Sequence, residues 1–183
     1  MVDLRSFLRR FGGDRGGISA VEFALILPFM VFTYVGSAEL GDGIAIYYKV
    51  TETARTVTDL TSQYVTIDPT TMGNILGASA TVVAPYSSAG MIVTLSQVNP
   101  TSATGQGTIA WSCSLNGTAH TVGATVTLPT NLQTPSGVSI IWGEVTYPYT
   151  PAMGFAVTGT INMYQAMYFY PRLSNSVALT SGC

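Results

Sequence analysis

The sequence is poor in charged residues and nearly lacks the side chains from which catalytic and metal sites are built. Charged residues make up 9% of its 183 residues, against about 25% in an average soluble domain. Two cysteines, neither in a CxxC pair, and one histidine are too few for a zinc site. The net charge of -2 gives no reason to expect nucleic acid as a partner.

Motifs for small-molecule chemistry are missing as well. No P-loop or dinucleotide fingerprint occurs. From Pro69 onward only Glu144 and Arg172 are charged apart from the chain end, which excludes a carboxylate pair or a calcium cage there. The histidine, His120, lies in the turn-like stretch NGTAH, and we expect it to be solvated or structural. We therefore predict a protein that is not an enzyme and holds no metal or other cofactor.

The charge that is present lies mostly ahead of a long apolar run. Four of the seven basic residues lie within positions 1–17. The sixteen residues 23–38, FALILPFMVFTYVGSA, carry no charge, and counting from Ile18 gives twenty-one residues with Glu22 as the only charge. This is close to the roughly 20 residues of a membrane helix, and the arginines before it orient the N-terminus inward. We predict a basic tail over 1–17 and a transmembrane helix over 18–38, weakened or kinked at Pro28.

A helical pattern continues beyond the apolar run. Over 39–66 the apolar residues recur mostly at spacings of three and four, with polar residues between them. One helix from Glu22 to Tyr64 would be about 64 Å long. Its second half would present one apolar stripe that needs to be covered.

The pattern changes after Asp68-Pro69 to short β-prone runs separated by Gly, Pro and Asn. Several of these runs alternate apolar and polar residues, as expected of an antiparallel sheet with one covered face. The amphipathic half of the helix is the obvious cover. We predict an α+β fold with a β domain over 67–183. Its candidate strands are 91–98, 107–113, 121–128, 138–149 and 161–171.

The two cysteines, Cys113 and Cys183, allow two interpretations. If the β domain lies outside the cytoplasm, they form a disulfide that ties the C-terminus to the domain. A loop of that length would contribute about 4 kcal/mol through chain entropy. The alternative is two unpaired, buried thiols.

Glu22 separates three interpretations of the N-terminus. A secretory signal would be cleaved after Ala38, and an uncleaved anchor would keep the whole helix; both treat Glu22 as an accident. A cut between Gly17 and Ile18 would instead make Ile18 a new ammonium terminus. When such helices pack side by side, the Glu22 carboxylate of one can reach the ammonium group of its neighbour, so that a costly unpaired charge becomes a paired one.

The residues around Glu22 also resemble a known family. A basic leader ending in glycine, followed by GGISAVEFALILPFM, resembles the TadE-like minor pilins, or pseudopilins, of tight-adherence (Flp-type, type IVb) pili. The similarity continues through YYKVTETARTVTDLTSQ and returns weakly at VTYPYTPAMGF. Residues 16–63 carry most of it.

The resemblance implies how the protein is processed, where it is located and what it assembles into. A prepilin peptidase would cut between Gly17 and Ile18, and the mature protein would wait in inner-membrane lipid with its C-terminal domain in the periplasm. It would then prime, enter or tip an adhesive pilus at the cell surface, with the assembly platform and other major and minor pilins as partners. Glu22 would be the charge partner. The alternative is a secreted or anchored periplasmic binding or adhesion domain.

Overall fold

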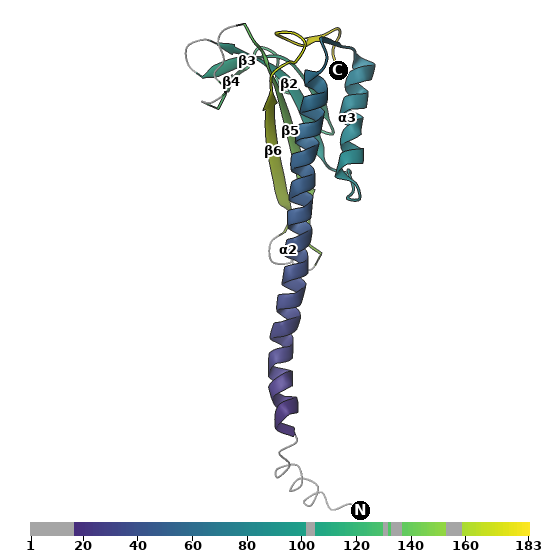
Figure 1. Cartoon of the computed structure of the whole chain (residues 1–183), viewed down its shortest axis with the longest axis vertical. Coiled ribbons are helices and arrows are strands. Elements are labelled where there is room, and N and C mark those ends of the chain that lie inside the picture. Colours follow the sequence, from purple (N-terminus) through teal and green to yellow (C-terminus); the bar gives the residue numbers. More distant parts are fainter. Residues whose placement is uncertain (1–16, 102–104, 130–131, 133–136, 153–158) are drawn as a thin grey trace, which may run out of the picture. The chain divides into compact units, whose positions relative to one another are not determined.

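The computed structural model describes residues 17–101, 105–129, 132, 137–152 and 159–183. The chain divides into two compact units, Met1–Gly41 and Asp42–Cys183. Residues 1–16 of the predicted basic tail lie outside the described residues. The predicted α+β class is confirmed: a long N-terminal helix precedes an antiparallel sheet domain (Figure 1).

The helix α2 runs from Ile18 to Ser62 and contributes to both units. It continues through Pro28 and ends close to the predicted Tyr64. Within the second unit it buries one stripe, which includes Val50, Ala54 and Val57. Buried hydroxyls on this stripe donate to the helix's own carbonyls, as Thr58 Oγ1 does to Ala54 O at 2.6 Å. The polar positions in the stripe are therefore satisfied without any outside partner.

A five-stranded antiparallel sheet forms the body of the second unit, in the order β4-β3-β2-β5-β6. Four of its strands match the predicted runs closely, and the predicted run 121–128 is reduced to three paired residues. The strands are β2 (Ile92–Thr101), β3 (Gln106–Leu115), β4 (Thr125–Thr127), β5 (Ile140–Tyr149) and β6 (Ile161–Phe169).

One face of this sheet is covered by helices. Val93, Leu95 and Trp111 belong to the same buried cluster as Val50 and Val57 of α2. The helix comes so close to the sheet that a Cβ at Gly143 of β5 would overlap Thr58 Oγ1. Glycine at this position therefore sets how closely α2 packs on the sheet.

A second helix, α3 (Pro69–Val83), shares this cover and was not predicted from the sequence. Its start has a clear signal in hindsight, because Asp68 is the N-cap and Pro69 occupies the first turn. Asp68 Oδ1 accepts a hydrogen bond from Thr71 N at 2.9 Å, and Oδ2 accepts one from Thr71 Oγ1 at 2.9 Å. These bonds, the backbone one first, lower the pKa of Asp68.

The C-terminal segment contacts β1, the end of α2 and the sheet. Strand β7 (Ala178–Leu179) pairs in parallel with β1 (Thr66–Ile67). Arg172 forms an ion pair with Asp59 of α2. The indole Nε1 of Trp111 donates to Val177 O at 2.8 Å. The segment thus joins the end of α2 to the sheet.

Candidate functional site

The described part of the first unit presents an exposed, apolar helix surface. Every described residue from Gly17 to Tyr34 is exposed. Phe32 is 78% exposed and Leu25 is 74% exposed. Among the described residues, α2 is the one helix long and apolar enough to cross a membrane by length and composition. Its other exposed apolar side chains here are Ile18, Val21, Phe23, Ile26, Leu27, Phe29, Met30, Val31 and Tyr34.

Glu22 is the one carboxylate on this surface. It is exposed between Val21 and Phe23 and forms no ion pair within the part of the chain that the structure describes. It lies one helical turn beyond Ile18, which is a rise of about 6 Å along the axis. The structure therefore puts Ile18 and Glu22 on the same side of α2, at the beginning of the helix.

Gly17 immediately precedes α2 and is exposed. A Cβ built on it would meet no atom within 4 Å. The described residues therefore place no steric demand for glycine at this position, unlike at Gly143.

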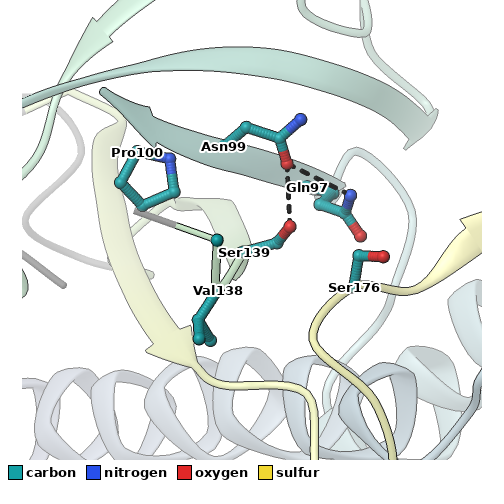
Figure 2. Close-up of a pocket in the computed structure, with 7 residues that line it drawn as sticks. Gln97, Asn99, Pro100, Val138, Ser139 and Ser176 are labelled. Atoms are coloured by element: carbon teal, nitrogen blue, oxygen red, sulfur yellow. Dashed lines mark hydrogen bonds between the residues drawn. The ribbon is translucent and has the colours of Figure 1, made fainter. Parts of the chain in front are cut away.

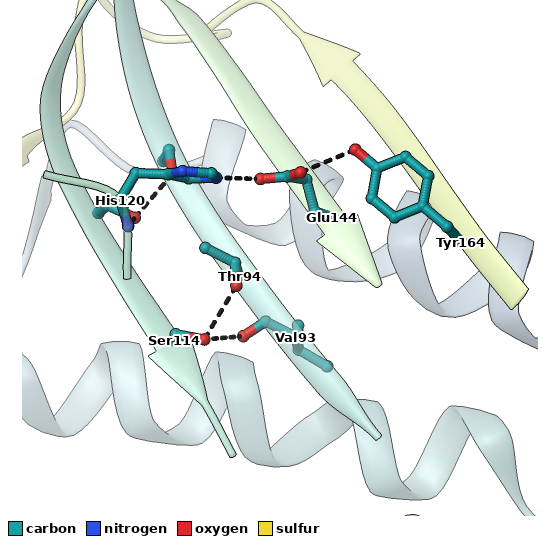
Figure 3. A network of polar contacts seen from close by, with 8 residues as sticks. Val93, Thr94, Ser114, His120, Glu144 and Tyr164 are labelled. Carbon is teal, nitrogen blue, oxygen red and sulfur yellow. Dashed lines mark hydrogen bonds and ion pairs between the residues drawn. The ribbon is translucent and has the colours of Figure 1, made fainter. Parts of the chain in front are cut away.

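A second polar group lies on the sheet face opposite the helices (Figure 3). His120 Nε2 lies 2.5 Å from Glu144 Oε2, and Tyr164 donates its hydroxyl to Glu144 Oε1 at 2.7 Å. The backbone N–H of His120 donates to Ser112 Oγ at 3.0 Å. His120 is half-buried rather than solvated, so of the two expectations the structural one fits.

Aromatic rings extend this cluster across the strands. The His120 ring stacks on Trp142 with centroids 4.8 Å apart, and Trp142 stacks on Tyr168 at 6.0 Å. Burial, reinforced by the hydrogen bond to Glu144, raises the pKa of Tyr164. Burial and the Glu144 charge also raise the pKa of Tyr168. Both faces of the indole are occupied by neighbouring rings, so it offers no open platform for a ligand.

This cluster connects a loop to the sheet. His120 Nε2 contacts one carboxylate oxygen of Glu144 and the Tyr164 hydroxyl donates to the other, so Glu144 is held from both sides. The effect is to fasten the β3–β4 connection to β5 and β6. The sequence signal was that His120 and Glu144 are the one histidine and the one carboxylate side chain after Asp68, which reasoning from the turn-like NGTAH alone missed.

The two cysteines are paired with each other. Cys113 and Cys183 form a disulfide with their Cα atoms 5.6 Å apart. Among the residues that the structure describes, no group of three or more His, Cys, Asp or Glu side chains gathers in one place.

Comparison with known proteins identifies one region. Residues 17–59 match the family model of TadE-like proteins, which confirms the resemblance seen around Glu22. The match covers most of α2 and stops before the sheet domain. The chain matches no curated protein and no solved structure.

Proposed function

With residues 17–59 similar to the TadE-like proteins, we propose that the chain is a minor pilin of a tight-adherence pilus. A prepilin peptidase cuts it between Gly17 and Ile18. Residues 18–38 hold it in the inner membrane, with the C-terminal domain in the periplasm. From there it primes, enters or tips the pilus, in contact with the assembly platform and other major and minor pilins. Its role is structural rather than catalytic.

The observation that carries this proposal is the single carboxylate on an otherwise apolar, exposed helix surface. A charged side chain within a membrane helix is costly, by about 2.5 kcal/mol or more at the helix centre, unless it finds a partner or reaches water. After a cut at Gly17, the Ile18 ammonium group is that partner. The ammonium group that reaches Glu22 is the one of a neighbouring helix.

Assembly brings the two groups together. A neighbouring helix displaced by one turn, about 6 Å, brings its own Ile18 ammonium level with Glu22. Because a charge with no partner in an apolar contact is heavily penalised, only this register is favourable. Glu22 therefore selects the stagger of neighbouring helices, whereas the apolar side chains supply contact area.

One further feature supports the cut at Gly17 over one at Ala38. Gly17 lies immediately before α2, so a cut there leaves the helix whole. By contrast, α2 runs unbroken through Ala38, and a signal-peptide cleavage site there would cut within it.

A charge-removing substitution tests this proposal. Glu22→Gln keeps the shape of the side chain and removes its charge; the matched control, Glu52→Gln, changes an exposed glutamate of α2 in the second unit. We expect Glu22→Gln to be inserted and cleaved normally, but to fall at least about tenfold in the sheared pilus fraction, the effect of 1.4 kcal/mol. The control should match the wild type. Normal incorporation of Glu22→Gln would contradict the pairing role.

A further inference from the structure

The sheet opens into a cavity where two of its strands separate. Strands β2 and β5 pair from Ile92 and Thr146 as far as Val98 and Ile140. Beyond that point Ser139 N donates to Asn175 O of the C-terminal segment at 2.8 Å, and β2 continues paired only with β3.

The opening has a volume of about 340 Å³. Figure 2 shows its lining residues around the open space. They come from β2, from the segment before β5 and from the C-terminal segment. The lining residues are Gln97, Asn99, Pro100, Gly137, Val138, Ser139 and Ser176.

A hydrogen-bond chain fixes the polar wall of this cavity. Gln97 is only 5% exposed, and its Oε1 accepts a hydrogen bond from Val177 N at 2.7 Å. Its Nε2 therefore faces Asn99, whose Oδ1 it contacts at 3.4 Å. Ser139 Oγ donates to the same Asn99 oxygen at 2.8 Å. Because its oxygen receives both bonds, Asn99 presents its amide nitrogen as a donor.

The wall chemistry selects the kind of ligand. None of the seven lining residues is charged, so an ionic ligand would lose its hydration without gaining a counter-charge. Amides and hydroxyls provide donors and acceptors side by side, which suits ligand hydroxyls that both donate and accept. Pro100 and Val138 add apolar surface for C–H groups. The volume lies at the small end of the roughly 300–1,000 Å³ range of ligand sites.

We propose that this cavity binds one residue of a neutral saccharide. Vicinal hydroxyls contact Asn99, Ser139 and Ser176, and the C–H face of the sugar ring lies against Pro100 and Val138. The site is built by the sheet and the C-terminal segment of the second unit alone. It therefore does not depend on how Glu22 or the cut at Gly17 acts.

Binding of simple sugars to the full chain tests this proposal. The protein, isotope-labelled and held in a detergent without a sugar headgroup, is titrated with glucose, galactose, mannose or N-acetylglucosamine. Concentrations up to ~0.1 M detect dissociation constants well into the millimolar range. We expect at least one neutral sugar to shift the amide signals of Gln97 and Asn99, and glucuronate to do so at least about tenfold more weakly, because its carboxylate finds no counter-charge.

Two variants test whether the sugar binds in this cavity rather than elsewhere on the protein. Asn99→Asp keeps the oxygen that Ser139 uses but replaces the donor with a charged acceptor, and should weaken binding at least about tenfold. Asn162→Asp makes the same change at an exposed site on β6 and should bind as the wild type does. If Asn99→Asp fails to fold, Ser176→Val, at an exposed lining residue, replaces it. The absence of any sugar-induced shift, shifts that cluster elsewhere, or equal binding by the cavity variant would overturn the proposal.

Discussion

Along the single helix α2, Phe32 is 78% exposed, whereas Val50 and Val57 are completely buried. The first stretch is apolar on all sides except at Glu22; the second is apolar on one stripe, and the sheet and α3 cover that stripe. An apolar surface of the first kind needs lipid or other copies to cover it. A surface of the second kind is already buried by other elements of the same chain. One element thus carries two kinds of surface, an exposed one in the first unit and a buried one in the second.

Truncation should have the largest effect, because it separates the exposed part of α2 from the part that packs in the second unit. A chain of residues 42–183 should be soluble without detergent and melt cooperatively, because its core is complete without the first unit. A chain that begins at Ile18 is the matched control and should still require detergent, since it keeps the apolar surface. Sedimentation and thermal melting monitored by circular dichroism provide the measurement. Aggregation of residues 42–183 would show that the second unit depends on the first.

Loss of the disulfide should produce the next largest effect, confined to the second unit. Cys113 and Cys183 are 70 positions apart. A loop of this length predicts that Cys113→Ala/Cys183→Ala loses about 4 kcal/mol in the free energy of unfolding. Urea titration measures this loss, and reduction of the wild type separates the bond from the atoms removed. Equal unfolding midpoints with and without the bond would contradict the prediction.

Gly143 tests how closely α2 packs on the sheet. An added methyl group would overlap Thr58, so Gly143→Ala should lower the free energy of unfolding by about 1–3 kcal/mol. Thr58→Ala in the same chain should recover part of this loss. Gly77→Ala is the matched control: it has open space in α3 and should stabilise by roughly 0.5–1 kcal/mol. If the two alanine variants behave alike, the close approach does not set the packing.

The smallest predicted effect is a loss of stability at alkaline pH. The pKa values of Tyr164, Tyr168 and Tyr147 are raised, principally by burial. A raised phenol pKa means that the unfolded state ionises first. The stabilisation is therefore fully present below about pH 10 and is lost as the pH rises above it. Melting temperatures from pH 7 to 11 should fall less steeply in Tyr164→Phe than in the wild type. Tyr48→Phe, at an exposed position, should follow the wild type.

Sequence reasoning was most accurate where a pattern repeats. The amphipathic stripe and the alternating strands each have a period, and the apolar run has a characteristic length; together they predicted α2, four strands and the α+β class. It failed at α3, whose two glycines and many threonines obscure helical periodicity, although Asp68-Pro69 marked its start. It also missed the His120–Glu144 contact and the cavity beside Asn99. Both depend on long-range strand register, which local patterns do not encode.

The mature N-terminus of the protein, isolated from its own cell membranes and read by mass spectrometry, tests the central claim most directly. The account predicts a chain that begins at Ile18, with Glu22 as its fifth residue and one helical turn from the new ammonium group. A chain that begins at Glu39, or one that keeps Met1 in cells with an active prepilin peptidase, would contradict it, because in neither would Glu22 have the Ile18 ammonium as a partner.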